Sequence, residues 1–100
     1  MPSRHYSFWL NEVTYIVIDF KSLDGKVLSF VVRLVHIWNG IDTDVARYDT
    51  AHGCPHRDLL TRSGRLRQKD WLGDMSFNGA LTHAIDDFKT NHEAYIQSWS

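Results

Sequence analysis

Two tight-turn signals on either side of one alternating segment constrain the fold of this chain more than any other feature. Asn39-Gly40 is the dipeptide best suited to a type I′ turn, because both central residues of that turn need positive φ. Leu23-Asp24-Gly25-Lys26 supplies turn residues on the other side of residues 27–38. The even positions of this segment form its more apolar face: Leu28, Phe30, Val32, Leu34, His36 and Trp38. The pattern predicts antiparallel strands over 14–22, 27–38 and 44–49, with that even face toward the core.

The second half of the chain predicts one more hairpin and then a long helix. Residues 58–62 and 65–70 flank Ser63-Gly64, where Gly64 would take the left-handed position. From Phe77 onward the apolar positions follow steps of three, four and seven, which is typical of one helical stripe: Phe77, Leu81, Ala84, Ile85, Phe88, Tyr95 and Trp99. Ser76 or Asp74 can cap this helix. Its opposite, solvated side is expected to hold Asp86, Asp87, Lys89 and Glu93.

These elements predict a single α+β domain over residues 1–100, an antiparallel meander of about five strands with one long C-terminal helix packed on one face. One helix covers only one face of a sheet, yet the odd face is apolar too, with Tyr15, Val17, Val31, Val35 and Ile37. Either the amino-terminal aromatic residues Tyr6, Phe8 and Trp9 fold over this face, or a second copy of the chain covers it as a homodimer.

Charge and composition exclude several classes of protein. The net charge of -1 gives no overall attraction toward nucleic acid or anionic lipid, so a nucleic-acid role would need a local basic patch. The apolar run 27–38 is too short for a membrane span and contains Arg33, so no membrane segment is expected. Cys54 is the only cysteine and the amino terminus lacks a secretory signal pattern, which predicts a cytoplasmic protein.

The segment Arg47–Leu60, RYDTAHGCPHRDLL, concentrates reactive side chains between two apolar elements. His52 and His56 with Asp49, Asp58 or Cys54 offer ligands of the kind that zinc or iron accepts, but no second element completes a ligand set. We therefore expect no metal and no cofactor. The remaining chemistry is acid/base catalysis, a set that suits cleavage of RNA through its own 2′-hydroxyl: His52 or His56 to move a proton, Asp49 or Asp58 to orient the imidazole, and Arg47 or Arg57 to stabilise developing negative charge.

Two further features bear on this interpretation. A strand over 65–69 would place Arg65, Arg67 and Lys69 on one face, with Arg57 and Arg62 nearby, which favours an RNA partner. The alternative for this cationic stripe is a solvated edge strand protected against edge-to-edge pairing. The alternative for the segment Arg47–Leu60 is a structural network, in which Asp49 and Asp58 accept hydrogen bonds that hold an irregular loop.

The run RYDTAHGCPHRDLL, followed by GALTHAIDDFKTNHEAY, resembles a family of small uncharacterised bacterial domains with an RYD, HG and HRD pattern. It is more distantly similar to the TumE type of toxin in toxin–antitoxin pairs, although it reads His-Arg-Asp where those toxins tend to have a further histidine. The resemblance implies a bacterial cytoplasmic protein encoded beside an antitoxin, and the matching positions are Arg47, Asp49, His52, His56 and Arg57. The expected function is a toxin-like domain acting on RNA by metal-independent acid/base chemistry. The alternative is a non-enzymatic homodimeric binding module for a small molecule or a partner protein.

Overall fold

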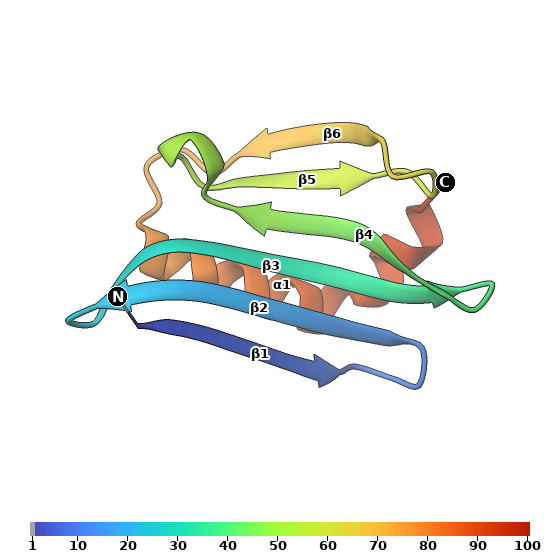
Figure 1. Ribbon diagram of the computed structural model, residues 1–100. Coiled ribbons are helices and arrows are strands. Elements are labelled where there is room, and N and C mark those ends of the chain that lie inside the picture. The colour runs from blue at the N-terminus through green and yellow to red at the C-terminus, as the bar shows by residue number, and fades with distance from the viewer. Residues whose placement is uncertain (1) are drawn as a thin grey trace.

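The computed structural model describes residues 2–100 as one curved sheet with a helix behind it (Figure 1). The six strands form an antiparallel meander in chain order: β1 (Ser3–Trp9), β2 (Thr14–Leu23), β3 (Lys26–Trp38), β4 (Ile41–Asp49), β5 (His56–Leu60) and β6 (Leu66–Trp71). A short 3-10 turn, η1 (Ala51–Gly53), joins β4 to β5, and the chain ends with α1 (Phe77–Ser98). The predicted α+β class is confirmed, with six strands in place of about five.

The two turns that fix the meander have the backbone geometry that their residues indicate. Asp24 and Gly25 have φ values of 49° and 78°, and Asn39 and Gly40 have values of 52° and 75°. Positive φ at both central residues matches the right-handed twist of the flanking strands, so each turn leads directly from one strand into its neighbour. The predicted reversals on both sides of β3 are confirmed.

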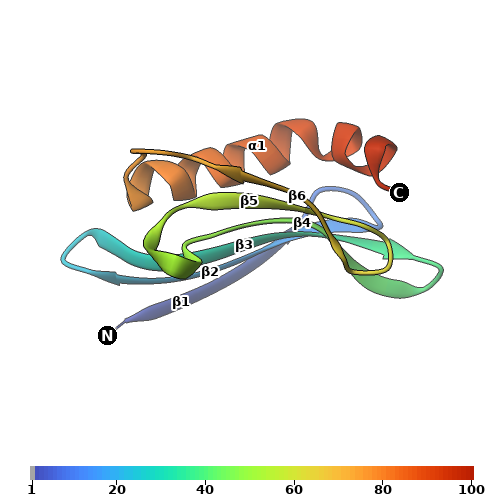
Figure 2. The same cartoon turned by 90° about the horizontal axis from the view of Figure 1, so that it is seen from above.

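The core lies between the sheet and α1, which covers only one face (Figure 2). Phe30, Val32 and Leu34 of β3 are almost completely buried on this side and pack in one cluster with Ala84 and Phe88 of α1. The helix begins as predicted, because the Ser76 hydroxyl accepts a hydrogen bond from the Gly79 amide at 3.0 Å. In the described part of the chain, no helix has the length and apolar character needed to cross a membrane.

The amino-terminal segment extends the sheet, so the expectation that its aromatic residues fold over the uncovered face is wrong for Tyr6 and Phe8, whereas Trp9 lies opposite Tyr15 and packs on that face. β1 pairs along its whole length with β2, and Tyr6 and Phe8 lie opposite Ile18 and Ile16. Tyr6 and Phe8 therefore point to the α1 side. Val17 and Val35, on the uncovered side, are already only 5% and 2% exposed. The single chain thus already buries these two apolar residues of the uncovered face, and the pairing of two copies stays a prediction.

Candidate functional site

Side chains of the uncovered face lie in rows that cross the strands, because directly opposed residues of an antiparallel pair point to the same side. One row spans all six strands: His5, Asp19, Val31, Asp49, His56 and Trp71. The next row consists of Ser7, Val17, Arg33, Arg47, Asp58 and Lys69. The two rows bring Arg47, Asp49 and His56 together, three of the five residues predicted to act in catalysis.

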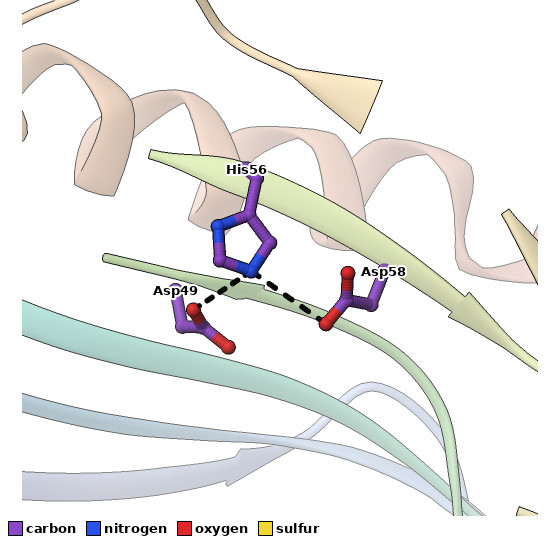
Figure 3. Close-up of side chains that lie close together, drawn as sticks. All are labelled: Asp49, His56 and Asp58. Atoms are coloured by element: carbon purple, nitrogen blue, oxygen red, sulfur yellow. Dashed lines mark ion pairs between the residues drawn. The ribbon is translucent and has the colours of Figure 1, made fainter. Parts of the chain in front are cut away.

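His56 is enclosed between two carboxylates at the centre of these rows (Figure 3). Its Nε2 atom lies 2.9 Å from Asp49 Oδ1 and 3.6 Å from Asp58 Oδ2, and its Nδ1 atom lies 3.1 Å from the Cys54 carbonyl oxygen. A carbonyl oxygen and a carboxylate oxygen are hydrogen-bond acceptors, so each ring nitrogen of His56 faces an acceptor. The side chain of His56 is 1% exposed, which leaves no ring atom open to solvent.

Two cations complete the enclosure from the neighbouring strands. Arg47 donates from Nη2 to Asp58 Oδ2 at 2.8 Å, and Lys69 Nζ lies 3.0 Å from Asp58 Oδ1. Burial alone would raise the pKa of Asp58, but the hydrogen bonds from Arg47 and Lys69 hold this pKa below its ordinary value. The hydrogen bond to Asp58 likewise raises the pKa of Arg47. Asp58 is therefore a buried, ionised carboxylate whose charge is balanced on three sides.

The two carboxylates and the imidazole of this network could offer ligands to a metal ion. Asp49, His56 and Asp58 each place one ligand atom within 4.8 Å of the others, and a histidine whose Nδ1 faces a backbone carbonyl is a common metal ligand. The charge balance argues against a divalent ion, because Arg47 pairs with both Asp49 and Asp58, and Lys69 pairs with Asp58. Asp49, His56 and Asp58 are thus better explained as part of an ion-pair network within the protein. This explanation agrees with the alternative interpretation of the segment Arg47–Leu60, in which its aspartates form a structural network.

The other two predicted catalytic residues lie elsewhere. His52 is exposed at η1 and has a φ of 66°, so it projects from the loop that joins β4 to β5. Arg57 follows His56 in β5 and points to the α1 side, where it donates to Asp70 from Nη2 at 2.5 Å and to Tyr95 from Nη1 at 2.9 Å. Arg57 therefore lies on the face opposite His56, because neighbouring strand residues alternate between faces, and His52 belongs to a loop outside the His56 network.

A second polar network, centred on Asp87, was not predicted. The Asp87 carboxylate accepts hydrogen bonds from the hydroxyls of Tyr48, at 2.7 Å, and Tyr95. His83 lies beside this network, with Nε2 at 3.5 Å from the Tyr48 hydroxyl. Helical spacing placed Asp87 on the solvated side, which is wrong. The polar hydroxyls of Tyr48 and Tyr95 require an acceptor at the edge of the core, and that requirement was the available signal.

The predicted cationic stripe of Arg65, Arg67 and Lys69, with Arg62 nearby, does not form one surface. Arg62 lies over the rings of Trp38 and Trp99, at 5.0 and 5.2 Å from their centroids. Arg67 donates to the Ser98 carbonyl oxygen of α1, Lys69 pairs with Asp58 on the opposite face, and Arg65 is exposed near the turn. A register shift places Leu60 opposite Leu66 although Leu59 faces Gln68. This bulge breaks the alternation on which the stripe depended.

An open hollow of about 560 Å³ lies on the uncovered face beside the His56 network. Its lining comes from the ends of β1, β2 and β3 and from the β4–η1 junction, and includes Lys21, Val31 and Asp49. Asp19 and Asp49 flank Val31 in the cross-strand row, and each aspartate is paired on its far side, with His5 and His56 respectively. The two ion pairs draw the carboxylates away from Val31, which leaves the hollow above it.

The fold and this face define a small α+β domain, with a sheet covered by a helix on one side and a polar, hollowed surface on the other. The chain belongs to a family described as a domain of unknown function, DUF7718, whose match covers residues 1–100. No curated protein and no solved structure matches the chain.

Proposed function

We propose that this domain is a non-enzymatic binding module, and that the hollow on the uncovered sheet face is its ligand seat. The observation that carries the proposal is the hollow itself, because about 560 Å³ lies within the range of roughly 300–1,000 Å³ that is usual for small-molecule sites. Val31 provides an apolar floor and Lys21 a charged rim, the combination of apolar surface and a few polar groups by which such sites bind and orient a ligand.

The groups beside the hollow favour binding over catalysis. A general acid or base must come within about 3 Å of the proton that it transfers. His56 is sealed, with both ring nitrogens bonded, and Asp49 already accepts from His56 and from the Ala51 amide. These side chains hold the strand ends in place, so the surface they support suits recognition without turnover.

The test blocks the hollow with a substitution and detects ligand binding from amide chemical shifts in a two-dimensional NMR spectrum. A fragment library should contain compounds that shift the amides around Val31 in the wild type. Val31→Trp should abolish these shifts, because the indole occupies the seat. Ser7→Trp adds the same ring to an exposed position of the same face outside the lining, and should bind the fragments as the wild type does. The proposal fails if no fragment moves these amides, or if Val31→Trp still binds them.

A second candidate is the toxin-like domain acting on RNA, with an antitoxin as its partner. Its support is the contact between Arg47, Asp49 and His56, together with the partly exposed side chains of Arg47 and Lys69, at 36% and 29%. On this candidate the exposed His52 is the one histidine of the predicted set that can reach RNA.

This candidate is tested by expressing the protein and measuring cell growth and RNA integrity. His52→Ala should relieve a growth arrest and restore intact RNA, since the substitution removes an exposed imidazole without disturbing the core. His5→Ala changes another exposed histidine of the chain and should stay toxic. Equal growth and equal RNA integrity for all three proteins would rule the candidate out.

A further inference from the structure

We infer that the hollow takes a small organic anion, whose charged group lies at Lys21 and whose apolar part lies over Val31. This inference rests on the proposed binding function and adds the chemical class of the ligand. It starts from a short cross-strand row at one end of the hollow, in which Lys21 lies between Ser3 and Ser29 on the uncovered face. A lysine flanked by two serines offers several hydrogen-bond donors to a carboxylate or a similar anion.

Lys21 is also one of two cations of this lining that have no ion-pair partner in the described part of the chain; the other, Arg4, lies opposite Phe20, which packs against the core on the α1 side. Asp19 pairs with His5, and Asp49 pairs with His56 and Arg47. Among residues 2–100, Lys21 has no ion-pair partner within 4.0 Å. The lining therefore carries a local positive charge at its Lys21 end, and an anionic ligand would supply the missing partner.

The row that contains Val31 sets the orientation of such a ligand. Asp19 and Asp49 stand one strand away from Val31 on either side, so the gap between their backbones is two strand spacings, about 10 Å. A carboxylate placed over Val31 would lie between these two acidic side chains, which repel it. The apolar part fits this gap, and the charged group is directed along β2 and β3 to the Lys21 end.

The experiment compares three probes that share one ring system and differ in charge: naphthoate, naphthamide and naphthylmethylammonium. Their dissociation constants are measured from the amide shifts around Val31, with the wild type, Lys21→Met and Lys26→Met. Lys26 is an exposed lysine at the start of β3 that does not line the hollow, so Lys26→Met is the matched control. Methionine keeps much of the apolar stem of lysine and removes its charge.

We expect naphthoate to bind most tightly, and Lys21→Met to weaken it about tenfold, the usual scale for one charged hydrogen bond. Naphthamide should be insensitive to Lys21→Met, and Lys26→Met should behave as the wild type. If naphthamide or the ammonium probe binds as tightly as naphthoate, or if Lys21→Met leaves naphthoate binding unchanged, the anion inference is overturned while the binding function stands. If none of the three shifts the amides around Val31, both are overturned.

Discussion

His52 and His56 are four positions apart in the chain and differ completely in surroundings. His56 is buried between Asp49 and Asp58, whereas His52 is exposed and makes no side-chain hydrogen bond within the described residues. We expect His56→Asn to lower the free energy of unfolding by about 3 kcal/mol, because it leaves buried carboxylates without their partner. His52→Asn should change it by less than about 0.5 kcal/mol, since asparagine tolerates the positive φ found there. Urea denaturation of the two variants and the wild type checks both values, and similar losses in both variants would contradict this assignment.

Only part of the arrangement around His56 could be predicted from the sequence. The alternation of β-strands separates His56 from Arg57 and could have been applied to them before the structure was known. The burial of His56 could not be deduced in this way, because it depends on Lys69 and Trp71 of β6 meeting Asp58 and His56 across the sheet. Residue types thus indicated a polar cluster around Asp49, and long-range register decided which members belong to it.

At the scale of elements, the Asp58 carboxylate of β5 connects three strands, because it accepts a hydrogen bond from Arg47 of β4 and forms an ion pair with Lys69 of β6. Its folded pKa is lower than its unfolded pKa, which is about 3.9, so its contribution to stability is complete above that pH and is lost as the pH falls through the folded pKa. We expect the free energy of unfolding to decrease as the pH falls below about 4. The free energy of unfolding of Asp58→Asn should decrease less steeply over this pH range. Some pH dependence should remain in this variant, since the pKa values of Asp70 and Asp87 are also lowered. Denaturation curves at several acidic pH values measure these slopes, and parallel slopes in the variant and the wild type would contradict the role of Asp58.

Elements with two different faces were predictable, and the edge strand β1 was not. β3 alternates between buried and more accessible positions and lies between two tight turns, so its pattern is clear. β1 is exposed along nearly its whole length, and its sequence SRHYSFW carries no burial signal, because backbone pairing with β2 holds it in place. The hollow depends on this strand, since His5 of β1 pairs with Asp19. Without the position of β1, the hollow could not be predicted.

At the scale of the whole molecule, the two faces of the sheet carry different structural features. The α1 side holds the hydrophobic core and the Asp87 network, which links α1 to β4 through Tyr48 and to β5 through Tyr95 and Arg57. The uncovered side holds the His56 network and the hollow. Because different residues of the same strands point to the two faces, we expect substitutions on the uncovered face to alter the hollow while the attachment of α1 stays intact.

The attachment of α1 to the sheet should weaken at alkaline pH. Burial and the hydrogen bond to Asp87 raise the pKa of Tyr95 to about 12, and burial raises the pKa of Tyr48 as well. A folded pKa above the unfolded value of about 10 contributes stability that is complete below pH 10 and is lost as the pH rises toward the folded pKa. We therefore expect the free energy of unfolding to decrease between about pH 10 and 12.

The matched variants for this expectation are Tyr95→Phe and Tyr6→Phe. Tyr95→Phe removes one of the two tyrosines whose pKa is raised. The variant should therefore have a lower free energy of unfolding below pH 10, and this free energy should decrease less steeply as the pH rises. Tyr6 is 51% exposed, and its stacking on Phe20 is kept by phenylalanine, so Tyr6→Phe should follow the wild type. Denaturation midpoints across this pH range, followed together with tyrosinate absorbance, give both quantities. A slope for Tyr95→Phe equal to that of Tyr6→Phe would mean that the Asp87 network does not couple the helix to the sheet in the way the hydrogen bonds indicate.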